Sequence, residues 1–226
     1  MSAGVPGDLG DLPREWFDRI DAGPDARFYA TPRLVTHIDD ATIAALTAYY
    51  GSALPAGAAL LDLMSSWVSH LPEQRFARVT GLGMNAVELA ENPRLDVRVV
   101  HDLNADPTLP FPDASFDAVL NAVSIQYLVR PVEVYAEVAR VLRPAGLSIV
   151  AMSHRCFPTK AVRAFHLLPR DERLALVARY HEAAGGFDRI EALDASPVAA
   201  DPLWIVIARR ARAPDAGARP AAATRR

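Results

Sequence analysis

The sequence lacks the features that mark several classes of protein. It contains a single cysteine, Cys156, so no internal disulfide can form and a reducing compartment is expected. No apolar run approaches the roughly 20 residues that a membrane helix needs. The first residues also have no apolar core of the kind found in secretory signals. We therefore expect a cytoplasmic protein that does not act at a membrane.

An excess of basic charge is also missing. The 24 Lys and Arg residues are balanced by 27 Asp and Glu residues, which gives a formal net charge of −3. A nucleic-acid-binding surface usually shows a clear basic excess, so we expect no nucleic-acid partner. The six histidines show no paired spacing, which argues against a metal site. These observations leave the partner and the oligomeric state open.

What the sequence does contain is an alternation of strand and helix patterns. Hydrophobic residues make up 51% of the 226 positions, enough for one large domain. Between the strands, Asn85 and Glu88 predict a capping box, Pro131 a first helical turn, and Pro169 a break between two helices. The alternation predicts an α/β fold, a Rossmann-like three-layer sandwich on a mostly parallel seven-stranded sheet. The predicted strands are residues 59–63, 76–82, 97–100, 116–121, 147–152, 189–193 and 204–208.

The two ends of the chain differ from this alternating region. Residues 1–52 predict a helical extension packed on the core, with helices near 13–20 and 39–51. Residues 53–210 form the alternating domain. Residues 211–226 are rich in Ala, Pro and Arg without periodicity, which predicts a disordered tail.

Two motifs in the second half of the domain carry a family resemblance. They read LPFPDASFD at 109–117 and EVARVLRPAG at 137–146. In this order they resemble class I S-adenosylmethionine (SAM)-dependent methyltransferases of type 11, the small-molecule branch. The segments LDLMSSWVSHLP, GLGMN and SHRCFPTKAV are similar to an uncharacterised methyltransferase-like subgroup of plants and bacteria. The resemblance implies SAM as the cofactor, an antiparallel last strand, and a methyltransferase-like domain over residues 53–210.

The chain departs from the family in the loop that follows the first strand. The family has three glycines there, and this chain has Met64, Ser66 and Val68. At the end of the second strand Gly83 replaces the acidic residue that binds the ribose, so Gly83→Asp would strengthen SAM binding if the loop tolerates a side chain. Two interpretations remain open. Either an adapted loop still binds SAM for methyl transfer to a small molecule, or the fold serves as a ligand-binding or protein-interaction module without methyl transfer.

The resemblance also implies which residues would contact the cofactor. Asp102 matches the acidic residue that meets the adenine amino group, and Trp67 offers a ring for adenine or for the sulfonium cation. The implied cofactor-binding residues are Asp62, Met64, Ser65, Ser66, Trp67, Gly83, Met84, Asp102, Leu103 and Asn121.

Catalytic candidates come from the loops after the fourth and fifth predicted strands. Tyr127 is placed to shape a substrate pocket, His154 to act as a general base and Arg155 to bind a carboxylate. The alternative is that His154 and Arg155 only cap the end of their strand. Arg33 and His37 either close over the pocket or cap the helix that follows them.

Overall fold

The computed structural model describes residue 9 and residues 12–212. Residues 1–8 and 10–11 of the predicted extension lie outside this range. So do residues 213–226, which make up nearly all of the predicted disordered tail.

One seven-stranded sheet forms the centre of the molecule, in the order β3-β2-β1-β4-β5-β7-β6. The pairs β1–β2, β2–β3, β1–β4 and β4–β5 are parallel, and β7 runs antiparallel to both of its neighbours. The predicted α/β sandwich with an antiparallel last strand is confirmed. The strands are β1 Ala59–Leu63, β2 Arg78–Gly83, β3 Val97–Val100, β4 Phe116–Ala122, β5 Leu142–Met152, β6 Phe187–Asp194 and β7 Trp204–Arg210.

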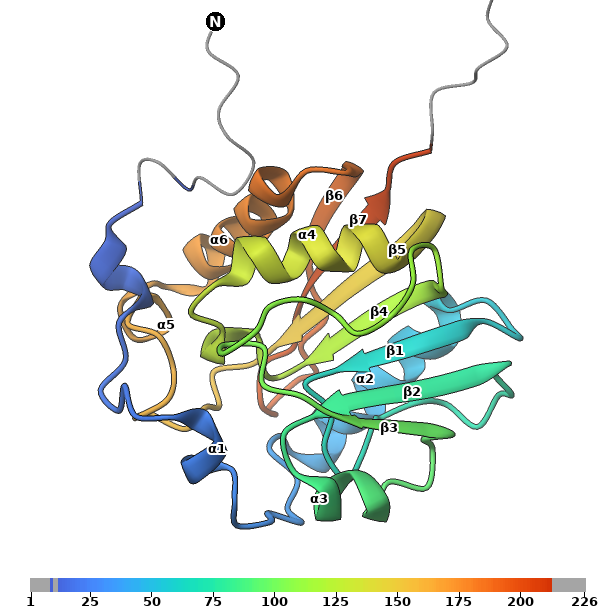
Figure 1. Ribbon diagram of the computed structural model, residues 1–226, viewed down its shortest axis with the longest axis horizontal. Helices are drawn as coiled ribbons and strands as arrows, with labels where there is room; N and C mark the ends of the chain where they lie inside the picture. Colours follow the sequence, from blue (N-terminus) through green and yellow to red (C-terminus); the bar gives the residue numbers. More distant parts are fainter. Residues whose placement is uncertain (1–8, 10–11, 213–226) are drawn as a thin grey trace, which may run out of the picture.

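Helices cover both faces of this sheet, with α4 and α6 on one face and α2 and α3 on the other (Figure 1). Each side has its own apolar core, one containing Val138 and Val177 and the other Leu46 and Leu89. The layers are therefore helix, sheet and helix. The helices are η1 Arg14–Phe17, α1 Asp25–Phe28, α2 Asp40–Ala53, α3 Ala86–Glu91, η2 Ile125–Tyr127, α4 Pro131–Val141, α5 Ala164–Leu167 and α6 Arg170–Ala184.

Most helix ends follow the local sequence signals. Asp39 caps α2 by accepting a hydrogen bond from the Thr42 N–H at 2.8 Å. The predicted end of α2 at Gly51 is wrong, because the helix continues to Ala53. Proline forces an extended conformation on the residue before it, so Pro55 rather than the glycine ends the helix.

The segment that carries η1 and α1 lies across the carboxyl ends of the parallel strands (Figure 1). Buried charges hold it there. Asp25 pairs with Arg19 at 2.7 Å and with the Nζ of Lys160, itself fully buried, at 3.0 Å. Because a broken buried ion pair is costly, these contacts fix α1 over the strand ends.

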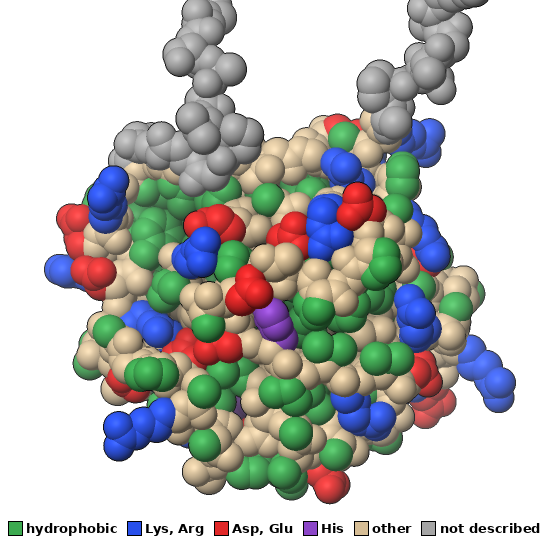
Figure 2. Space-filling view, viewed as in Figure 1, with side chains coloured by type: hydrophobic (Ala, Val, Ile, Leu, Met, Phe, Trp, Pro, Cys, Tyr) green, Lys and Arg blue, Asp and Glu red, His purple; other side chains and the backbone are tan. Residues whose placement is uncertain are grey.

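The surface carries mixed charge. On the face shown in Figure 2, Lys and Arg side chains are interspersed with Asp and Glu side chains. Within the described range, no helix is both long and apolar enough to cross a membrane.

Candidate functional site

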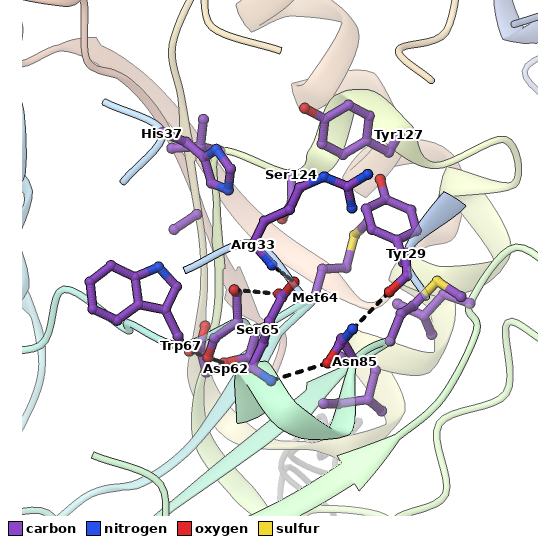
Figure 3. Close-up of a pocket in the computed structure, with 18 of the residues that line it drawn as sticks. Tyr29, Arg33, His37, Asp62, Met64, Ser65, Trp67, Asn85, Ser124 and Tyr127 are labelled. Atoms are coloured by element: carbon purple, nitrogen blue, oxygen red, sulfur yellow. Dashed lines mark hydrogen bonds between the residues drawn. The ribbon is translucent and has the colours of Figure 1, made fainter. Parts of the chain in front are cut away.

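A cavity opens at the carboxyl ends of β1, β2 and β4, beneath the segment that carries α1 (Figure 3). It encloses about 1140 Å³ of empty space, part of it open to solvent. Open α/β sheets bind ligands at this edge. The predicted cofactor residues that line it are Asp62, Met64, Ser65, Ser66, Trp67, Gly83, Met84, Asp102 and Leu103.

The loop after β1 forms the floor of the cavity. Met64 occupies the left-handed region with φ of 58°, a conformation that glycine adopts freely and that costs other residues about 1–2 kcal/mol. The backbone at the first family glycine position thus keeps a glycine-like conformation. Buried Asp62 Oδ2 accepts hydrogen bonds from Ser65 and Ser69 Oγ, both at 2.6 Å. Burial raises the pKa of Asp62 to about 6, and the two hydrogen bonds oppose this rise.

Gly83 at the end of β2 is pressed against the same loop. The Ser65 N–H donates to the Leu82 carbonyl at 2.7 Å, and a Cβ on Gly83 would lie 2.1 Å from the Ser65 carbonyl oxygen. Its φ is not in the left-handed region, so the constraint is the close approach of two backbones. The loop therefore does not tolerate a side chain at position 83. We no longer expect Gly83→Asp to strengthen SAM binding.

Glu88 does not complete the predicted capping box. Asn85 caps α3 as predicted, but Glu88 turns to the cavity wall, where Oε2 accepts from Ser66 Oγ at 2.6 Å and Oε1 from the Arg33 N–H at 2.8 Å. Asn85 Nδ2 also donates to the Tyr29 carbonyl at 2.9 Å (Figure 3). The start of α3 therefore joins the β1 loop to the N-terminal segment.

Asp102 and Asn121 have different positions relative to the cavity. Asp102 Oδ1 accepts from the Asn104 N–H at 3.0 Å, whereas its Oδ2 accepts no hydrogen bond from the described part of the chain. One carboxylate oxygen is thus available to a ligand. Asn121 is not among the lining residues, because it is buried behind Met64 and Ser124. Its Nδ2 lies 3.5 Å from the Met64 sulfur, and its Oδ1 accepts from Ser124 Oγ at 2.8 Å.

The predicted catalytic residues do not lie together. His154 and Arg155 do not line the cavity, and their side chains are 51% and 58% exposed. Both side chains lie instead near the carboxylate of Asp201, His154 at 3.4 Å and Arg155 at 3.9 Å. Tyr127 does line the cavity, stacked on Phe157, whose N–H donates to the Tyr127 hydroxyl at 2.8 Å. Burial raises the pKa of Tyr127 to about 12. Its hydroxyl therefore stays protonated and can donate to a ligand.

Arg33 and His37 line the cavity, which agrees with the first of their two predicted alternatives. Tyr29 and His70, which the sequence did not single out, line it with them. Burial lowers the pKa of His37 and lowers that of His70 to about 4, so both imidazoles are neutral at pH 7. The Nδ1 of His70 is buried, with no hydrogen-bond partner among residues 9 and 12–212. No group of three or more His, Cys, Asp or Glu in that range is arranged to hold a metal ion.

Comparison with known proteins agrees with this geometry. A profile of the family described as "Methyltransferase domain" matches residues 64–150, from the loop after β1 into β5. This match over residues 64–150 and the curated relatives support the resemblance to class I SAM-dependent methyltransferases. The [4+2]-cyclase SpnF, a solved structure, is similar with a TM-score of 0.57 at 18% identity. The similarity covers 74% of this chain and 81% of that one, and it shows the fold alone.

Two curated relatives are similar to part of the chain. The chain is 32% identical over 107 residues to 24-methylenesterol C-methyltransferase 2 of Oryza sativa subsp. japonica, which covers 43% of this chain. It is 38% identical over 82 residues to a probable S-adenosylmethionine-dependent methyltransferase of Mycolicibacterium smegmatis, which covers 34% of this chain. The similarity spans 30% of the length of each relative.

Proposed function

We propose that this protein binds SAM in the cavity at the strand ends and transfers its methyl group to a small molecule. The observation that carries the proposal is the gathering in one cavity of nearly all residues that the family resemblance assigns to the cofactor. They come from the loop after β1, the end of β2 and the turn after β3, which are distant in sequence. The names of both curated relatives support the same chemistry.

The residues present fit SAM in three respects. The free oxygen of Asp102 and the buried side chain of Leu103 suit the adenine end. Glu88 places a carboxylate in the cavity wall, although Gly83 supplies none. A carboxylate has about four acceptor sites, so Glu88 can accept from a ribose hydroxyl while keeping its present partners. Met64 has its backbone in the left-handed region, so the loop keeps the conformation that a glycine would allow at this position.

The chain's own contribution to the reaction is positioning. SAM supplies an electrophilic methyl group, and the protein holds the acceptor in line with it. Tyr127 donates a hydrogen bond to the acceptor, and the neutral imidazole of His37 is available to take a proton. Because His154 and Arg155 do not line the cavity, we expect His154→Ala and Arg155→Ala to leave SAM affinity unchanged.

A second candidate is a methyltransferase fold that binds another ligand and transfers no methyl group. The contact between Gly83 and the Ser65 carbonyl favours it, because the backbone fills the place of the ribose-binding side chain. Losing a hydrogen bond to a charged group costs about 1.5–3 kcal/mol. That loss alone lowers affinity roughly tenfold to a hundredfold and does not abolish a site with several other contacts.

Calorimetric titration of the purified protein with SAM and with S-adenosylhomocysteine separates the two candidates. We expect saturable binding of both, with dissociation constants on the order of micromolar to tens of micromolar. Absence of heat and of any thermal shift at millimolar ligand would support the second candidate.

A further inference from the structure

Arg33 brings a positive charge into the cavity from the N-terminal segment. Its side chain extends across the cavity toward Tyr29 and Tyr127 (Figure 3). Its Cζ lies 4.4 Å from the centre of the Phe28 ring and 5.2 Å from that of Phe157. Contacts with two aromatic rings attract the guanidinium to this position, where Arg33 is half-buried.

This guanidinium has no carboxylate partner within ion-pair distance in residues 9 and 12–212. Two of its five N–H donors reach the carbonyls of Phe28, at 3.0 Å, and Thr31, at 3.3 Å. The nearby Glu88 carboxylate is engaged by the Arg33 backbone N–H and by Ser66. Other arginines of this structure do have partners: Arg19 with Asp25, Arg140 with Glu137 and Arg143 with Asp117.

The cavity is lined by groups of both charges. Its acidic residues are Asp25 on α1, Asp62 on β1, Glu88 on α3 and Asp102 after β3. Asp25 is already paired with Arg19 and Lys160. Arg33 stands over Phe157, which follows β5. A cationic cofactor suits the carboxylates of Asp62 and Asp102, and an anionic group suits the guanidinium of Arg33 and the donating hydroxyl of Tyr127.

We infer that Arg33 binds a carboxylate of the methyl acceptor, so that the protein selects an aromatic or otherwise apolar acid. This inference rests on the proposed function and names the substrate class of the same site. The planar guanidinium matches a carboxylate with two parallel hydrogen bonds. The rings of Tyr29, Tyr127 and Phe157 contact the apolar body of the acid. The anion-binding role that the sequence suggested for Arg155 therefore passes to Arg33.

The test compares two probes that differ in charge, 4-hydroxybenzoate and 4-hydroxybenzamide. Their dissociation constants are measured for wild-type protein and for Arg33→Met, Arg33→Lys and Arg27→Met. Arg27→Met is the matched control, because it removes an exposed positive charge from α1 outside the cavity. We expect wild type and Arg27→Met to prefer the carboxylate about tenfold to a hundredfold, as expected for hydrogen bonds between charged groups. Arg33→Met should lose the preference and Arg33→Lys should keep part of it.

Equal affinities of wild type for the two probes, including no binding of either, would overturn the inference. A preference that survives in a folded Arg33→Met protein would also overturn it. A second arm identifies the source of the carboxylate. If Arg33→Met weakens SAM but not 5′-methylthioadenosine, which lacks the amino acid part, and wild type shows no probe preference, Arg33 holds the cofactor instead. If SAM fails to bind wild type while the probe preference still depends on Arg33, the acid site stands and the methyl-transfer proposal fails.

Discussion

Adding a single methyl group at Gly83 should destabilise the protein and disturb its cavity. The Cβ of Gly83→Ala would meet the Ser65 carbonyl oxygen at 2.1 Å and the Ser65 carbonyl carbon at 3.1 Å. Backbone cannot move aside as a side-chain end can, so either the β1 loop or the end of β2 must shift. Overpacking of this kind costs about 1–3 kcal/mol. The shift would break the hydrogen bond from the Ser65 N–H to Leu82.

Urea unfolding of three proteins measures this effect. Gly51→Ala is the matched control, because Gly51 is exposed in α2 and its added Cβ would make only an ordinary 3.8 Å contact with Pro72. We expect Gly51→Ala to gain up to about 1 kcal/mol from helix propensity and Gly83→Ala to lose about 1–3 kcal/mol. A Gly83→Ala protein as stable as wild type would show that the loop does not press on β2.

Three further changes test other contacts. Burial raises the pKa of Asp62 to about 6, so its contribution to stability is full below pH 3.8 and is lost as the pH rises through 6. Asp62→Asn should remove this decrease in stability between about pH 4 and pH 7. If urea unfolding of the variant shows the same pH dependence as wild type, the raised pKa of Asp62 is contradicted. Asn85→Ala removes the cap of α3 and the link to Tyr29. It should cost about 1–2 kcal/mol and speed proteolysis near Tyr29, whereas wild-type cleavage rates would count against the link. Ala145 has φ of 65°, so Ala145→Gly should raise the melting temperature slightly, and a lower one would argue against strain there.

The centre of the sheet could be predicted from the sequence because β1, β4 and β7 are largely buried apolar runs. Phe116–Ala122 is such a run, and its central place in the sheet follows from the family resemblance. The edge strands β3 and β6 are mostly exposed and give weaker patterns. The loops that the resemblance assigns to the cofactor line the cavity because they follow directly from strand ends. Asn85 and Pro131 marked helix starts correctly because their effect is local.

Whether the N-terminal segment lies over the cavity could not be decided from the sequence. Arg33 and His37 stand in a segment without periodicity, and only the buried charges around Asp25 bring that segment over the strand ends. Glu88 matches the capping-box pattern, but its carboxylate accepts hydrogen bonds from Ser66 and from the Arg33 backbone N–H instead. The position of His154 was set by Asp201, which lies far along the chain. Each of these outcomes depends on polar contacts between residues distant in sequence, which local patterns do not reveal.

We propose that SAM occupies this cavity with its adenine against Asp102. The most direct measurement is the SAM dissociation constant of Asp102→Asn, which keeps the turn to Asn104 and removes the free anionic oxygen. Asp188→Asn, on the exposed face of β6, is the control for loss of charge. We expect Asp102→Asn to weaken SAM binding roughly tenfold to a hundredfold, from a loss of about 1.5–3 kcal/mol, with an unchanged melting temperature. The control should match wild type. Equal SAM affinity in wild type and Asp102→Asn would contradict the account.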